Sequence, residues 1–247
     1  MKKYILVIFT LCLILSGCSQ NNNIKVDTTA KADTPIVIAD TIKQQFLEYE
    51  KKDIYVINSV KVNTEVKENT MIRKSGKEIY VETDSKTLIL YKEGVNYAYN
   101  TDSAEMIKLS DLQPDYKNQE IIKPFIQKSI QILNWSISNK DAFIVDKSEK
   151  TTNNTVFKVY TFTGKDNAWL KTQYDKTYGL FDFWKSSKLT FKFQYVFDKN
   201  DKLIQYIWDI SDEAKTNVMH TDGKIGNNIE DAYSQTGFNF DSIFKNM

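Results

Sequence analysis

The stretch Lys188–Asp198, KLTFKFQYVFD, decides the fold of this chain. Large apolar side chains occupy every second position in it: Leu189, Phe191, Phe193, Tyr195 and Phe197. A period of two places these side chains on one face of a strand and the polar ones on the other. A polar loop follows, and then LIQYIWDI (Leu203–Ile210) alternates again, with Tyr206 and Trp208 on its apolar face. The stretch therefore predicts an antiparallel hairpin with one aromatic, buried face.

The same pattern recurs upstream in shorter units. Alternating apolar residues from Ile54 to Val66 predict one long strand, and five short strands separated by polar turns follow between residues 71 and 109. Further strands are predicted at 142–145 and 155–163. Because turns of two to four residues leave no room for a parallel crossover, neighbouring strands are expected to pair antiparallel.

Two segments change to a helical period. Asp40 suits an N-cap and predicts a helix from there to about Lys52. From Asn118 to Ser138, apolar residues recur every three or four positions, which predicts an amphipathic helix with Pro124 in its first turns. Its apolar stripe is Ile122, Ile126, Ile130, Leu133 and Ile137. Short helices are predicted around residues 229–233 and 241–245, and the remainder of 166–186 and 212–247 gives no clear pattern.

The N-terminus carries the most specific motif. Lys2 and Lys3 precede an apolar run over residues 4–15, which is too short for a permanent membrane span. The run ends in Leu15-Ser16-Gly17-Cys18, which resembles a bacterial lipobox. The resemblance implies cleavage before Cys18 and attachment of a diacylglycerol to it; an ordinary secretory signal is the alternative. We expect a signal peptide over residues 1–17, a lipidated cysteine and flexible tether over 18–34, and one domain over 35–247.

Composition narrows the possible functions. The chain carries 33 Lys and Arg against 32 Asp and Glu, which argues against the basic face of a nucleic-acid-binding protein. Its two cysteines, Cys12 and Cys18, both lie in the N-terminal segment, so the processed body has no thiol for a disulfide, a zinc site or a nucleophile. His220 is the single histidine, and HTDG (His220–Gly223) is typical of an exposed turn. We expect no enzymatic activity, metal or cofactor.

These elements predict an α+β fold in which one curved antiparallel sheet is covered by helices. Their order, with the segments Lys77–Val81, Leu88–Tyr91 and Val95–Tyr99, resembles the LolA/LppX-like bacterial lipoproteins over about residues 39–211. The resemblance implies an open half-barrel around a pocket for acyl chains. It also implies that the helices at 40–52 and 118–138 cover the concave face.

Two functions are therefore open. The main hypothesis is a non-enzymatic lipoprotein, monomeric and anchored to the outside of the bacterial cell membrane through Cys18, that binds a lipid or lipoprotein acyl chain between sheet and helices. The residues expected to line that cavity are Ile122, Ile126, Ile130, Leu133, Phe191, Phe193, Tyr206 and Trp208. The alternative is an envelope interaction or scaffold module with a filled core and no ligand.

Overall fold

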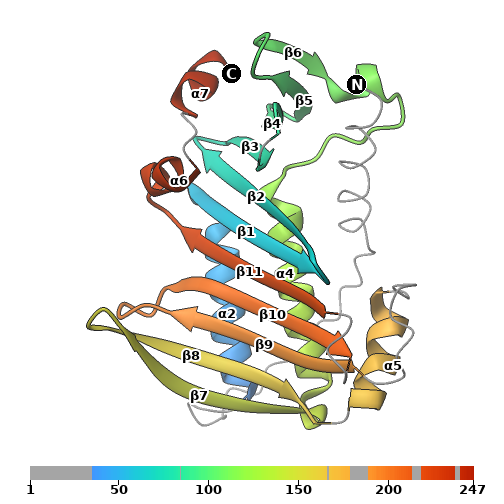
Figure 1. Ribbon diagram of the computed structural model, residues 1–247, viewed down its shortest axis with the longest axis vertical. Helices are drawn as coiled ribbons and strands as arrows, with labels where there is room; N and C mark the ends of the chain where they lie inside the picture. The colour runs from blue at the N-terminus through green and yellow to red at the C-terminus, as the bar shows by residue number, and fades with distance from the viewer. Residues whose placement is uncertain (1–34, 84, 166, 179–188, 213–217, 237–239) are drawn as a thin grey trace.

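The computed structural model describes residues 35–83, 85–165, 167–178, 189–212, 218–236 and 240–247 (Figure 1). The predicted signal peptide, the tether and Cys18 lie outside these residues. Eleven strands form one open antiparallel sheet in the order β6-β5-β4-β3-β2-β1-β11-β10-β9-β8-β7. Their bounds are β1 (Ile54–Val62), β2 (Glu65–Lys74), β3 (Lys77–Glu82), β4 (Thr87–Lys92), β5 (Val95–Asn100), β6 (Glu105–Lys108), β7 (Phe143–Thr152), β8 (Thr155–Gly164), β9 (Leu189–Phe197), β10 (Leu203–Asp212) and β11 (Val218–Gly226). The predicted single antiparallel sheet is confirmed.

Tight turns explain why these strands pair with their sequence neighbours. The hairpins β2–β3, β4–β5 and β7–β8 each close with two residues at positive φ: Ser75-Gly76, Glu93-Gly94 and Asn153-Asn154. Two consecutive left-handed residues form the type I′ turn, whose twist matches that of the flanking strands. Glycine and asparagine adopt this conformation at low cost, which sets the hairpin positions.

The helices lie on both faces of the sheet. They are α2 (Pro35–Tyr49), α3 (Leu109–Leu112), α4 (Ile122–Ser138), α5 (Asn167–Tyr178), α6 (Ile229–Thr236) and α7 (Asp241–Asn246), with a 3₁₀ turn at Lys140–Ala142. Helices α2 and α4 pack against each other on one face, which we call the inner face (Figure 1). Helices α6 and α7 pack on the opposite, outer face over β1–β4, where they bury a second apolar cluster. The expectation that the first and the long helix share one face agrees with this arrangement.

Several element boundaries differ from the sequence prediction. The strand predicted from Ile54 to Val66 is two strands, because Asn63 adopts a left-handed φ of 56° and turns the chain back. The predicted N-cap Asp40 lies inside α2, which begins at Pro35, a residue favoured in the first helical turn. Helix α4 begins at Ile122 rather than Asn118, because Asn118 is engaged with β5: its side-chain oxygen accepts a hydrogen bond from the Asn96 backbone N–H at 2.9 Å.

Strand β11, which joins the two halves of the sheet, was not predicted from the sequence. It lies between β1 and β10, and it comes from the segment for which no pattern was found. HTDG, predicted to be an exposed turn, lies within β11, where His220 pairs with Asp209 of β10 and with Lys61 of β1. Two glycines and polar residues break the apolar alternation of this strand, so a period of two is not visible. The predicted short C-terminal helices are confirmed as α6 and α7.

Candidate functional site

The residues expected to line a cavity come together on the inner face. Six of them are at most 1% exposed, Trp208 is 9% exposed, and Ile130 is partly buried. All eight belong to or pack against the same cluster, which also contains Phe46, Phe125 and Trp135. The sequence therefore identified side chains that meet in space, on α4 and on β9–β10.

The buried stripe of α4 is rotated from the predicted one. Ser129 and Ser136 are 0% and 2% exposed and lie at its centre, whereas Ile130 and Ile137 are partly buried at its margin. Each serine hydroxyl donates to the carbonyl four residues earlier: Ser129 to Phe125 at 3.0 Å, and Ser136 to Ile132 at 2.9 Å. These bonds satisfy the hydroxyls inside the core, so two small polar residues can occupy buried positions.

Aromatic rings fill the space between α2, α4 and the sheet. The ring centroids of Phe125 and Tyr206 are 5.5 Å apart, and those of Phe46 and Phe125 are 6.3 Å apart. At the other end of α4, Trp135 lies 5.5 Å from Phe191 and 5.6 Å from Phe143. The ring centroids of Tyr206 and Trp208 are 4.6 Å apart, with the ring planes tilted by 37°. These separations are those of directly contacting rings, so the aromatic residues predicted to line a cavity pack against one another or against other rings of the inner cluster.

Tyr206 crosses two strands of the inner face. Its ring lies over Gly223 of β11, where a Cβ atom would come within 1.9 Å of the tyrosine Cζ. The hydroxyl reaches β1 and donates to Asn58 Oδ1 at 3.0 Å. Burial raises the pKa of Tyr206 well above its usual value, with the nearby Asp222 adding to the shift. Gly223 is therefore required by the close approach of this ring.

A buried ion pair connects the ends of the two inner helices. Arg73 and Glu78, on β2 and β3, are 7% and 1% exposed, and Arg73 Nε donates to Glu78 Oε1 at 2.7 Å. Arg73 Nη1 also donates to the backbone oxygen of Glu50 at 2.5 Å, just beyond the C-terminus of α2. The second Glu78 oxygen accepts from the backbone N–H groups of Ile121 and Ile122, where α4 begins. Each charge lies at the helix end whose dipole favours it.

The outer face of β9–β11 carries polar and charged side chains. His220 Nδ1 lies 2.5 Å from Asp209 Oδ1, and both side chains are about one-third exposed, at 38% and 36%. Lys192 is directly opposite Asp209, and Lys61 is directly opposite His220. The nearby hydroxyls of Thr190 and Ser211 lie 2.6 Å from each other. This arrangement supplies paired charges on a surface.

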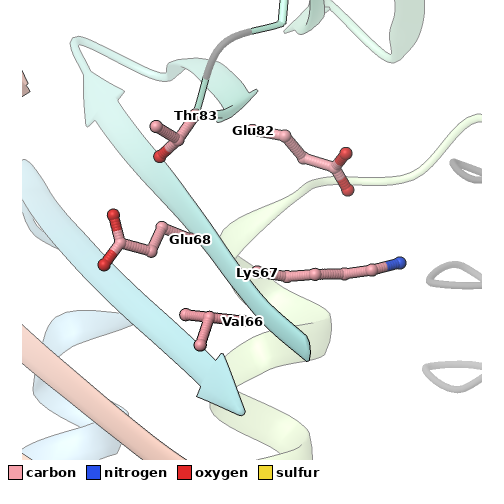
Figure 2. Close-up of a pocket in the computed structure, with 5 residues that line it drawn as sticks. All are labelled: Val66, Lys67, Glu68, Glu82 and Thr83. Carbon is pink, nitrogen blue, oxygen red and sulfur yellow. The ribbon is translucent and has the colours of Figure 1, made fainter. Parts of the chain in front are cut away.

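A groove of about 320 Å³ lies elsewhere, where the first residues of β2 lie beside the end of β3 (Figure 2). Its lining residues are Val66, Lys67, Glu68, Glu82 and Thr83, most of them polar or charged and solvent-facing. None of the eight residues predicted to line a cavity contributes to it. Within the described ranges, no group of three or more His, Cys, Asp or Glu residues could hold a metal ion.

Sequence reasoning missed Arg73, Glu78, Ser129 and Gly223 as structural determinants. Arg73 is the single arginine of a lysine-rich chain, and that contrast was a usable signal for a position requiring a multidentate donor. For Gly223, the tyrosine that covers it comes from a different strand, so local sequence offers no comparable signal. In the part of the chain that the structure describes, no helix combines the length and apolar character needed to cross a membrane.

Comparisons with known proteins give only a distant likeness. No family model matches the sequence, and no curated protein matches it. Among solved structures, MucB in the MucA/MucB complex of Pseudomonas aeruginosa is 9% identical with a TM-score of 0.37, covering 76% of this chain and 56% of that chain. MucB alone is 8% identical with a TM-score of 0.37, covering 77% and 58%. This chain thus spans little more than half of those structures, and likeness at this level carries no argument about ligand, partner or activity.

Proposed function

We propose that this protein is a non-enzymatic, lipid-anchored envelope protein that works through protein contacts rather than by carrying a hydrophobic ligand. The observation that carries the proposal is the packing of the predicted aromatic lining residues against one another and against other rings of the inner cluster. Phe125, Tyr206 and Trp208 contact ring to ring, as do Trp135 and Phe191. A pocket for a drug-sized ligand has about 300–1,000 Å³ of space, and direct contact between these rings, among the described residues, favours a filled core over such a pocket.

The outer face of β9–β11 is the surface that best supports such contacts. It displays Lys192 and Lys224 as exposed cations beside the partly exposed Asp209, His220 and Asp222. A rigid sheet with charges of both signs favours a partner of complementary charge pattern, since electrostatic matching governs partner choice and association rate. The inner helices and the buried ion pair would then act as the support that keeps this face in shape.

Whether the protein carries a bound lipid is tested by native mass spectrometry of the purified protein, with lipid extraction of the same sample. We expect the mass of the polypeptide and its N-terminal modification alone, and no thermal stabilisation by added phospholipid. A ligand that binds the native state must stabilise it. Co-purified lipid that is lost in Ile130→Glu, while the variant keeps its circular dichroism spectrum, would support the ligand-binding hypothesis instead.

The contact surface is tested by photo-crosslinking in the intact cell envelope. A photoreactive amino acid at Lys192 or Lys224 reports on the outer face, and the exposed Gln127 and Asn134 of α4 are the matched control positions. We expect a discrete crosslinked protein from the two outer-face positions only. Equal crosslinking from all four positions, or none from the outer face, would contradict the proposed surface.

The anchor is tested at Cys18, whose assignment comes from the lipobox resemblance. Cys18→Ser should leave an unprocessed precursor that carries no diacylglycerol. Normal processing and membrane retention of this variant would show that Cys18 is not the lipidated anchor.

A further inference from the structure

One edge of the sheet is formed by a long strand with an ordered pattern of charges. β7 is the last strand in the sheet order and pairs with β8, whereas the opposite edge, β6, has only four residues. Residues 146–152 of β7 are all exposed. A strand of this length at a sheet edge is a template for pairing with another chain.

The hairpin turn fixes which backbone groups of β7 point toward the open edge. Thr152 and Thr155 flank the two-residue turn and face each other in the register. In a two-residue hairpin this pair is hydrogen-bonded, and hydrogen-bonded pairs alternate along the ladder. Val145, Lys147, Glu149 and Thr151 therefore direct their backbone N–H and C=O groups away from β8.

We infer that β7 pairs antiparallel with β7 of a second copy of this chain, about a two-fold axis through Ser148. In this register Asp146 lies opposite Lys150 of the other copy, and Lys147 lies opposite Glu149. By symmetry each pairing occurs twice, the two Asp146–Lys150 pairs on one face of the joined sheet and the two Lys147–Glu149 pairs on the other. Opposite charges directly across an antiparallel pair are stabilising, whereas like charges are destabilising.

The other two-fold registers centred within residues 146–150 are disfavoured. Directly opposed residues in an antiparallel pair share a face, so the two-fold axis must pass through one residue of the strand. An axis at Asp146, Lys147, Glu149 or Lys150 places that charged residue against its own copy. Only Ser148 places a small uncharged residue on the axis. Edge charges commonly protect a strand against pairing with arbitrary partners, and of these five registers only the one centred on Ser148 is self-complementary in charge.

Cysteine crosslinking reads the register directly. Ser148 would form a non-hydrogen-bonded pair with its own copy, with Cα atoms close enough for a disulfide. We expect the purified full chain carrying Ser148→Cys to form a covalent dimer on oxidation. Asp146→Cys and Lys150→Cys are the matched controls and should give no more dimer than the parent chain, whose Cys12 and Cys18 set the background. Dimer from Ser148→Cys at the parental level, or equal dimer from all three positions, would overturn the inference.

Charge reversal gives a second, independent readout. In the Ser148→Cys background, Lys147→Glu converts two opposite-charge pairs into like-charge pairs, and the dimer yield should fall about tenfold. Adding Glu149→Lys restores opposite charges in the same register and should restore the yield. Circular dichroism melting checks that these exposed substitutions leave the fold intact. If the double variant stays as low as the single variant, the proposed pairing is wrong. This test involves neither a lipid nor another protein, so its result is separate from that of the proposed function.

Discussion

At the scale of single residues, the Arg73–Glu78 pair does more than neutralise two charges. The guanidinium contacts the C-terminal end of α2, and the carboxylate contacts the N-terminal end of α4, so the pair sets where both inner helices lie on the sheet. A buried ion pair adds little stability over a well-packed apolar pair, but removing one partner leaves an uncompensated charge. Arg73 and Glu78 are therefore expected to depend strongly on each other.

Arg73→Met should lower the free energy of unfolding by about 3–5 kcal/mol, because Glu78 then remains buried without its cation. The control is Lys86→Met, which removes a surface ion pair whose side chains are 74% and 60% exposed. That change should cost at most about 1 kcal/mol. Urea unfolding at neutral pH measures both, and equal losses for the two variants would contradict the role given to Arg73.

The raised pKa of Tyr49 predicts how the free energy of unfolding changes at alkaline pH. Burial, with smaller effects of Asp198 and Glu48, raises its pKa from 10.0 to about 12. Between these values the unfolded chain loses the proton while the folded chain keeps it, so the free energy of unfolding falls as pH rises from about 10 to about 12.

Tyr49→Phe should show a shallower loss of stability over that window than the parent chain. The variant also lacks the 2.7 Å hydrogen bond from the Tyr49 hydroxyl to the backbone oxygen of Leu203, so it is expected to start lower at neutral pH. Denaturant unfolding at neutral pH and at steps up to pH 12 follows both chains. Parallel curves would show that Tyr49 does not titrate as described.

At the scale of elements, α4 shows what a periodic sequence pattern can predict: it locates the helix and its packed face, but not the centre of that face. The apolar period located this helix and the face that packs on β9 and β10. It could not place the centre of that face, because isoleucines at 130 and 137 carry more apolar area than the serines that actually occupy the centre. What decides the rotation is the close approach of neighbouring elements together with the local bonds that satisfy Ser129 and Ser136.

Because the buried face of α4 is centred on Ser129, we expect the protein's stability to be sensitive to substitution at Ser129 and tolerant of substitution at the adjacent Ile130. Ser129 is 0% exposed, so Ser129→Leu should overpack the core and cost about 1–3 kcal/mol or more. Ile130 is partly buried at the margin, and Ile130→Val should change stability by less than about 1 kcal/mol. Thermal and urea unfolding of the two variants decide between the observed stripe and the one predicted from the sequence.

The strands show the same contrast: the sequence pattern predicts pairing between neighbours in sequence but not packing between distant segments. Alternation located the β9–β10 hairpin and the short strands from β3 to β6, because each of these pairs with a neighbour in sequence. It missed the turn at Asn63, where Thr64 and Val66 continue the alternation across the turn. It also missed β11, whose partners β1 and β10 supply the aromatic rings that cover its glycines. Packing between distant strands is not encoded in local periodicity.

At the scale of the whole molecule, the two faces of the sheet are stabilised by different pairs of helices. The inner core depends on α2 and α4, whereas the outer cluster over β1–β4 is closed by α6 and α7. Phe240 is 0% exposed within the outer cluster, next to Ile243 and Phe244. The C-terminal helices are therefore part of the folded unit.

Phe240→Ala should lower the free energy of unfolding by about 3–5 kcal/mol, because it removes a large buried side chain and leaves a cavity. Met106→Ala is the control, since Met106 is 42% exposed on β6 and its truncation should be nearly neutral. Urea denaturation compares them. A loss below about 1 kcal/mol for Phe240→Ala would show that α7 is only loosely attached.

The position of β11 between β1 and β10 sets the order in which the molecule can be completed. Strands β1–β6 form a run of local hairpins between neighbours in sequence, so this half of the sheet can pair without the rest of the chain. One side of β1 then stays unpaired until β11 joins it, and β11 follows every other strand of the sheet in the sequence. Until β11 pairs, the folding chain exposes both an unpaired edge and part of its aromatic interior. Before that closure, these two features make the folding chain prone to aggregation.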